Sequence, residues 1–230
     1  MDASINYLQR DCSTLKNTID MNRTEMNNGG FTEETYTAFV GDIIDLNEKE
    51  THQEKAVKDT ADKTAVQNEV IANAQKLVSD VKSAARSAYG NDPRNLNMFN
   101  IGADIPRSVK NLIPLCSYMS ELVEERKAVL LQNGLKQEKV DALKALPAEL
   151  KAADDAQETA KKVQKTHTME RDQAAKVLKE RTNKIRNFAK ACFSDRPEIL
   201  VQFEPIPKGR GGANGKEESN TPPVVNPPSA

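Results

Sequence analysis

The chain has 230 residues, enough for one or two domains that bury a core, and its 33 Lys and Arg against 34 Asp and Glu give a net charge of −1. This balance provides no single-signed field, so we expect neither nucleic acid nor a membrane as a partner. The sequence has no Trp and only 4% aromatic residues. It is rich in Ala and in straight-chain Lys, Glu and Gln, which lose little side-chain freedom in helices, and it therefore predicts an all-α protein.

The first residues, MDASINYLQRDC, lack the apolar core of a signal peptide, and no later run reaches the roughly 18 apolar residues of a membrane span. We therefore expect a soluble, cytoplasmic protein. Cys12, Cys116 and Cys192 are odd in number and form no CxxC pair, so the sequence indicates neither a disulfide framework nor a zinc knuckle. Each lies on an apolar helical column, where we expect it to be buried as a small hydrophobe.

The first predicted element is a helix whose apolar residues recur at intervals of three and four, the heptad pattern of left-handed helix packing. Its seam consists of Ile5, Leu8, Cys12, Leu15, Ile19, Asn22 and Met26. The segment 27–30 (NNGG) ends this helix, because Asn and Gly tolerate the left-handed conformation that closes a helix. Thr32 then begins a second helix, with Glu33 and Glu34 in its first turn, where the helix dipole favours acidic side chains.

The second helix is predicted to reach about Ala88 and, if continuous, would be about 85 Å long. Either it breaks near 50–55, with a matching break near 154–159, to give three-helix bundles, or the long helices stay continuous and pair antiparallel. We favour a bend or a short break there, because the middle of the seam buries little apolar area and should be the least stable part. That seam consists of Val57, Thr60, Thr64, Gln67, Ile71, Ala74, Val78, Val81 and Ala85.

Two similar stretches, GNDPRNLNMF at 90–99 and SDRPEILVQF at 194–203, indicate that one unit occurs twice. A shift of 104 takes Pro93 to Pro197 and, without a gap, Cys12 to Cys116 and Gly30 to Gly134. Shared helical period explains matching apolar columns, but it does not explain the shared glycine, proline turn and terminal Phe. We therefore predict tandem copies at 1–102 and 105–206 in an elongated antiparallel bundle. The second seam consists of Val109, Leu112, Cys116, Met119, Val123, Arg126 and Leu130.

The last residues, 207–230, form a segment rich in Gly and Pro that is predicted to be disordered. It contains one RGG triplet at 210–212, a weak indication of RNA contact. Its prolines at 223 and 227 miss the P-x-x-P spacing of SH3 ligands. We interpret it as a spacer or solubilising tail.

The two histidines of the chain form no recognisable metal motif. The shift of 104 takes His52 to Ala156, so His52 and His167 are not equivalent. The residues three positions before them are Lys49 and Gln164, which excludes the Glu-x-x-His pattern of di-iron bundles. His167 and Glu170 could touch a metal ion, but on so polar a face we expect them to be solvated.

Catalytic constellations are missing as well. Nucleophilic catalysis needs Ser, Cys or Thr beside a base held by a third group, and two non-equivalent histidines in polar stretches do not provide it. Acidic pairs such as Asp154-Asp155 and Glu124-Glu125 are ordinary on a solvated helix face. We therefore predict no enzyme, no cofactor and no catalytic, cofactor-binding or metal-binding residue.

The end of the second long helix is basic, and we expect its charges to match an acidic stretch of the first copy. The basic residues are Lys161, Lys162, Lys165, Arg171, Lys176, Lys179, Arg181, Lys184, Arg186 and Lys190. The alternative, a nucleic-acid groove, lacks aromatic residues for base stacking. A second alternative is a small-ligand pocket between helices, lined by Thr60, Thr64 and Gln67 or by Gln164, Thr168 and Arg171.

The layout of each copy resembles a group of uncharacterised bacterial helical-bundle proteins rich in Ala, Lys and Glu. The shared features are an N-terminal helix, a Gly turn with a Thr restart (here Gly30-Phe-Thr-Glu-Glu), a long helix and a Pro-rich C-terminal tail. The resemblance implies an all-helical fold and no activity. We expect a scaffold or protein-binding module that self-associates or binds a protein partner through an exposed part of its heptad seams, and in which no single polar residue is essential.

Overall fold

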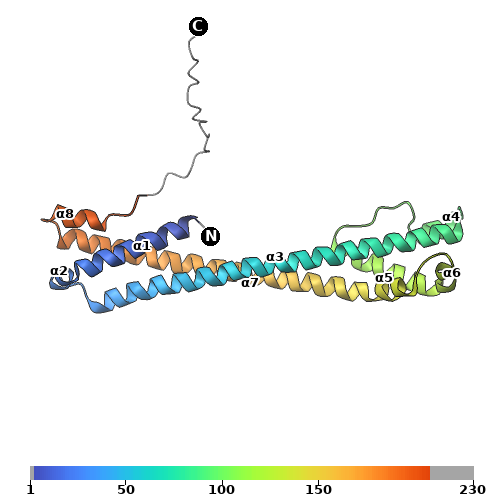
Figure 1. Ribbon diagram of the computed structural model, residues 1–230, viewed down its shortest axis with the longest axis horizontal. Helices are drawn as coiled ribbons and strands as arrows, with labels where there is room; N and C mark the ends of the chain where they lie inside the picture. Colours follow the sequence, from blue (N-terminus) through green and yellow to red (C-terminus); the bar gives the residue numbers. More distant parts are fainter. Residues whose placement is uncertain (1–2, 208–230) are drawn as a thin grey trace, which may run out of the picture. The chain divides into compact units, whose positions relative to one another are not determined.

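The computed structural model describes residues 3–207, all of whose regular elements are helical (Figure 1). The predicted all-α class is therefore confirmed for this range, while 208–230 of the predicted tail lies outside it. The helices are α1 (Ala3–Met21), α2 (Arg23–Asn28), α3 (Glu33–Tyr89), α4 (Pro93–Met98), α5 (Val109–Glu125), α6 (Lys127–Gln132), α7 (Gln137–Cys192), α8 (Pro197–Leu200) and the 3₁₀ turn η1 (Val201–Phe203).

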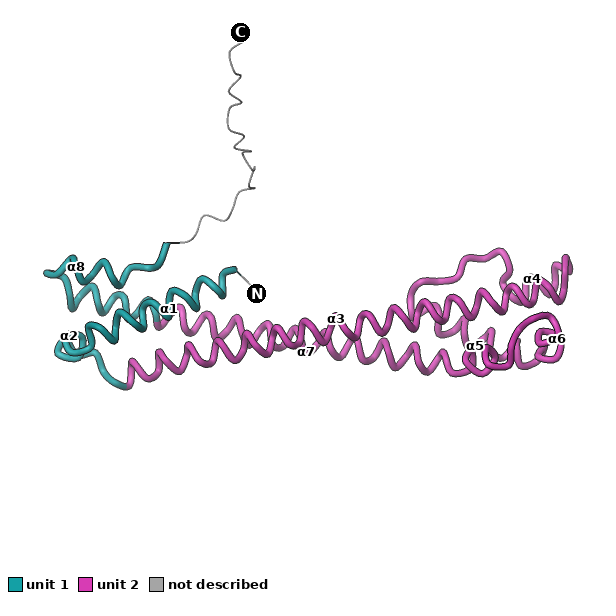
Figure 2. The backbone as a smooth tube through the Cα atoms, viewed as in Figure 1, with its two compact units in different colours: residues 1–33, 182–230 teal, residues 34–181 magenta. Residues whose placement is uncertain are grey.

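These helices form two compact units, coloured separately in Figure 2. The first unit comprises the residues up to Glu33 and those from Thr182 onward. The second unit comprises Glu34–Arg181. Each predicted copy therefore contributes residues to both units.

The predicted glycine turns are confirmed. Gly30 and Gly134 have φ values of +98° and +96°, the left-handed region that a side chain would strain. The amide of Phe31 donates to the carbonyl of Met26 at 2.9 Å, and that of Leu135 to Leu130 at 3.0 Å. The amide of each glycine also donates to the carbonyl of the residue three positions earlier. Together these bonds form Schellman motifs, which satisfy the last carbonyls of the helix.

The predicted breaks near 50–55 and 154–159 are wrong, because α3 and α7 each run through them as one helix. Within the second unit the two helices lie side by side and antiparallel (Figure 1). Their cross-helix contacts join residues whose numbers add to between 219 and 223, such as Lys49 with Glu170 and Gln67 with Asp154. Each helix thus covers the seam of the other, so neither helix has to break and fold back on itself to cover its own seam.

The apolar core of the second unit lies where the end of α3 meets α5, α6 and the start of α7. Its buried members are Ala74, Leu77, Val78, Val81, Ala84, Ala85, Phe99, Val109, Leu112, Cys116, Met119, Leu122, Val123, Leu130, Leu135, Val140, Leu143, Leu146 and Leu150. Burial of the second predicted seam is thus confirmed except at Arg126, which is exposed and separates α5 from α6. Burial of this much aliphatic surface makes this end the most strongly stabilised part of the unit.

The first unit packs α1 and α2 against the end of α7 and η1. Ile5, Cys12, Leu15, Ile19 and Met26 of the predicted seam are buried, and Leu8 is half-buried. The Phe31 and Phe188 rings contact each other with centroids 5.5 Å apart. The α1 seam is therefore largely as predicted.

A buried carboxylate fixes the end of the described chain onto the first unit. Asp11, 3% exposed, accepts hydrogen bonds from Arg186 Nη2 at 2.7 Å and from the backbone amide of Ile206 at 3.0 Å. Arg186 Nε also donates to the carbonyl of Phe203 at 2.8 Å, and Tyr7 Oη donates to that of Ile206 at 2.8 Å. The three bonds that involve Asp11 or Arg186 are charge-assisted, and with the Tyr7 bond they hold residues 203–206 in place.

Two of the three cysteines behave as predicted. Cys12 and Cys116 are fully buried, and burial raises the pKa of each thiol to about 11. Cys192 is only half-buried, so the prediction of burial fails there. Its Sγ atom lies 3.7 Å from the carbonyl oxygen of Glu25, close to the turn that ends α2.

Candidate functional site

Polar side chains replace the apolar seam in the middle of the α3–α7 pair. We define the central segment as residues 44–67 of α3 with 154–177 of α7. No Leu, Ile, Val, Met or Phe is buried between Leu46 and Ala74 of α3 or between Leu150 and Leu178 of α7. The predicted seam residue Val57 is 40% exposed, and its neighbour Ala56 is buried in its place. The sequence indicated few large apolar residues in this stretch, and in the folded helix pair none of them is buried between the limits given above.

At one end of the central segment, polar groups satisfy each other between the two helices. Gln67 Nε2 donates to Asp154 Oδ1 at 2.7 Å. One turn further along, Gln157 Nε2 donates to Thr64 Oγ1 at 3.2 Å. These bonds join opposite helices, so they fix the antiparallel register in the way that polar seam residues do in coiled coils.

At the other end, a buried acid faces a buried base. Glu50 and Arg171 are 3% and 8% exposed, and Arg171 Nη1 lies 3.6 Å from Glu50 Oε2. Neither carboxylate oxygen of Glu50 has a hydrogen-bond partner within the described chain. Arg171 instead donates from Nε and Nη2 to Asp172 Oδ1, at 3.0 and 2.7 Å. Glu50 is therefore held by charge attraction alone.

The two histidines lie next to this ion pair and face each other across the helix pair. The ring centroids of His52 and His167 are 5.7 Å apart, with the rings tilted by 59°. His167 Nδ1 lies 3.2 Å from Glu170 Oε2, and Lys49 Nζ lies 3.6 Å from the same oxygen. The hydrogen bond from His167 and the charge of Lys49 lower the pKa of Glu170. The side chains of His167 and Glu170 stay 29% and 41% exposed, in line with the expectation of solvation, and they also contact each other.

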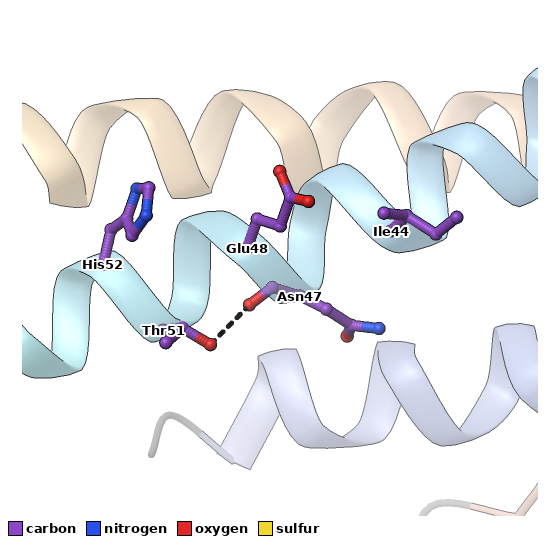
Figure 3. Close-up of a pocket in the computed structure, with 5 residues that line it drawn as sticks. All are labelled: Ile44, Asn47, Glu48, Thr51 and His52. Atoms are coloured by element: carbon purple, nitrogen blue, oxygen red, sulfur yellow. Dashed lines mark hydrogen bonds between the residues drawn. The ribbon is translucent and has the colours of Figure 1, made fainter.

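Beside His52 lies a shallow, open hollow of about 290 Å³ (Figure 3). Ile44, Asn47, Glu48 and Thr51 complete its lining, all from α3. Thr51 Oγ1 donates to the carbonyl of Asn47 at 2.9 Å, so this hydroxyl is engaged by its own helix. An enzyme or cofactor site normally encloses most of its ligand, which this hollow does not do.

The six residues of the alternative ligand pocket do not line this hollow. Three of them, Thr60, Thr64 and Thr168, donate their hydroxyls to the carbonyl four residues earlier in their own helix. Gln67 and Arg171 engage acidic side chains. The polar side chains of these five residues are therefore engaged within the helix pair instead of converging on a ligand.

Part of the basic stretch of α7 is neutralised within the second unit. Arg171 lies beside Glu50, and Arg181 Nε donates to Asp42 of α3. The expected match between a basic α7 and an acidic α3 is therefore found at these two arginines.

Within residues 3–207, no group of three or more His, Cys, Asp or Glu is placed to hold a metal ion, and none of the helices is long and apolar enough to cross a membrane. No known protein family, curated protein or solved structure matches the chain.

Proposed function

We propose that this protein is a non-catalytic helical scaffold that binds a protein partner, or a second copy of itself, along the central segment. The observation that carries the proposal is the pattern of exposed aliphatic side chains there. Six of the ten large apolar residues exposed among the described residues belong to this segment: Ile44, Val57, Val66, Val163, Met169 and Val177. Isolated exposed aliphatics are common, but their concentration where the helix pair buries few large apolar residues is typical of an interaction surface.

The register of the helix pair places four of these side chains in two levels. The residue numbers of Val57 and Val163 add to 220, and those of Ile44 and Val177 add to 221. Contacting pairs such as Glu50 and Arg171 also add to about 221, so each of these two pairs lies at the same level along the antiparallel helices. Val163 and Val177 are 14 residues apart, which is two heptads or about 21 Å of helix. A partner helix lying along α7 would therefore meet both valines with one apolar stripe.

We also propose that the chain arose from two tandem copies. The bounds of α2 and α6 differ by 104 at both ends, as do the first residues of α3 and α7. Cys12 and Cys116, like Ile19 and Val123, are fully buried at positions related by the same shift. The shift also takes Glu50 to Asp154 and Gln67 to Arg171. The Glu50–Arg171 ion pair and the Gln67–Asp154 hydrogen bond therefore lie at equivalent positions. Leu8 and Leu112 differ, being half-buried and fully buried.

The binding proposal is tested by placing charges on the proposed surface. The variant Val57→Glu with Val163→Glu should abolish self-association in sedimentation equilibrium, or the capture of a partner measured by quantitative mass spectrometry. Both residues are exposed, so the variant should keep its helical circular dichroism. Val129→Glu is the matched control, because Val129 is 39% exposed but lies on α6 outside the segment. Equal association of the double variant and the control would refute the proposal.

A further inference from the structure

His52 and His167 are the only histidines of the chain, yet the antiparallel pairing of α3 and α7 brings their rings together. Two imidazoles that share one metal ion at the usual Zn–N distance of about 2.0–2.1 Å have ring centroids roughly 5–6 Å apart. The observed separation is 5.7 Å. The two rings are thus already separated by the distance that a shared ion requires, and they come from different helices.

The surroundings of His167 supply the usual support of a metal-binding imidazole. Glu170 Oε2 lies 3.2 Å from His167 Nδ1, and a carboxylate can only accept, so Nδ1 carries the hydrogen. In a neutral ring the lone pair is then on Nε2, the nitrogen left to bind a metal. Carboxylate–histidine pairs of this kind orient the ring and strengthen the ligand. Lys49, the nearest cation to this carboxylate, is 3.6 Å from Glu170 Oε2, where the two charges offset each other.

The position of His52 leaves room for the rest of a coordination shell. His52 is exposed and lines the open hollow, so water can reach a metal ion bound there. Figure 3 shows the side chains of His52 and Glu48, one helical turn apart, extending from α3 in the same direction. A site with two protein nitrogens and bound water suits divalent ions that favour imidazole, such as Zn²⁺, Cu²⁺ and Ni²⁺.

We propose that His52 and His167 together bind one divalent transition-metal ion and thereby link α3 to α7 in the central segment. Two protein ligands are fewer than the three or four of dedicated zinc sites, so the site binds reversibly. The ion joins the helices where they lack an apolar core, and it therefore resists their separation. Because it binds only the paired helices, it stabilises them by mass action. This inference goes beyond the scaffold proposal and does not depend on any protein partner.

The test is a calorimetric titration of the full, tag-free chain with Zn²⁺. We expect one ion per chain, and at least tenfold weaker binding in His52→Ala and in His167→Ala. Glu170→Gln should weaken binding about tenfold, the usual effect of losing a carboxylate that supports a ligand. Circular dichroism checks that each variant keeps its helices. Unchanged affinity in either histidine variant would overturn the proposal.

A second readout separates a bridge between helices from an ion held by one helix. Zn²⁺ should slow hydrogen exchange of backbone amides near 50–54 of α3 and near 165–169 of α7 together in the wild-type chain, and on neither helix in His52→Ala. Protection of α7 alone would mean that His167 and Glu170 hold the ion without His52, which would refute the bridge. Cys192→Ser is the control for the half-buried thiol. Loss of the ion in that variant would place the site elsewhere and also overturn the proposal.

Discussion

The buried ion pair of the central segment allows a quantitative test of its contribution to stability. Glu50 has no hydrogen-bond partner in the described chain, whereas Arg171 also donates to Asp172. Arg171→Met removes the only cation within ion-pair distance of the Glu50 carboxylate in the described chain. An uncompensated buried charge costs about 3–5 kcal/mol. Glu50→Leu leaves Arg171 with its two bonds to Asp172, so we expect a loss of about 1 kcal/mol. We therefore expect Arg171→Met to lower the free energy of unfolding more than Glu50→Leu does.

The double variant Glu50→Leu with Arg171→Met separates charge from packing. Replacing a buried ion pair by apolar residues of similar volume is often neutral, or stabilising by about 1–4 kcal/mol. We therefore expect the double variant to be at least as stable as the wild type. Urea unfolding followed by circular dichroism at 222 nm gives the free energies, and hydrogen exchange shows whether the change is local to the segment. If the double variant is as unstable as Arg171→Met alone, the reasoning is wrong.

Three further outcomes are expected. Only Cys192 should react rapidly with iodoacetamide at pH 8 in the folded chain, because Cys12 and Cys116 are buried with pKa values of about 11; peptide mapping after labelling checks this. The same raised pKa values contribute stability that is complete below pH 9.0 and lost as the pH rises through about 11, so replacing Cys12 and Cys116 by Ala should flatten the alkaline fall in unfolding free energy. Finally, Lys63→His with Ala156→His rebuilds the histidine pair at the positions given by the shift of 104, and calorimetry should then count two Zn²⁺ per chain if both the repeat and the metal site are correct.

The local features of this fold could be predicted because short stretches of sequence determine them. The heptad seam from Ile5 to Met26 specifies which face of α1 and α2 is buried, and Gly30 and Gly134 specify where a chain can turn with positive φ. The continuity of α3 and α7 was mispredicted, because the sequence does not say which helix covers a weak seam. A partner helix that supplies Gln157 to Thr64 and Asp154 to Gln67 makes the polar middle of α3 compatible with one long helix.

The histidine pair was missed for a related reason. His52 and His167 are 115 positions apart and are not related by the shift of 104, so neither motif spacing nor the repeat connects them. The missing information was the antiparallel register. Once two residues such as Gln67 and Asp154 are known to be in contact, the sum of their numbers predicts that position 52 lies opposite a residue near 167. Residue types were therefore not what the prediction lacked. It lacked the long-range pairing of α3 with α7.

The proposed copies differ at positions that the shift of 104 relates. Asp42 and Arg181, an ion pair, correspond under the shift of 104 to Leu146 and Leu77, both buried in the core of the second unit. One half of the α3–α7 pair thus has charges where the other half has leucines. The ion pair is partly exposed, with the Arg181 and Asp42 side chains 32% and 18% exposed, whereas both leucines are buried. We therefore propose the charged half, with its histidines and exposed valines, as the region that carries the function, because departures from the simplest stable packing are typical of functional sites.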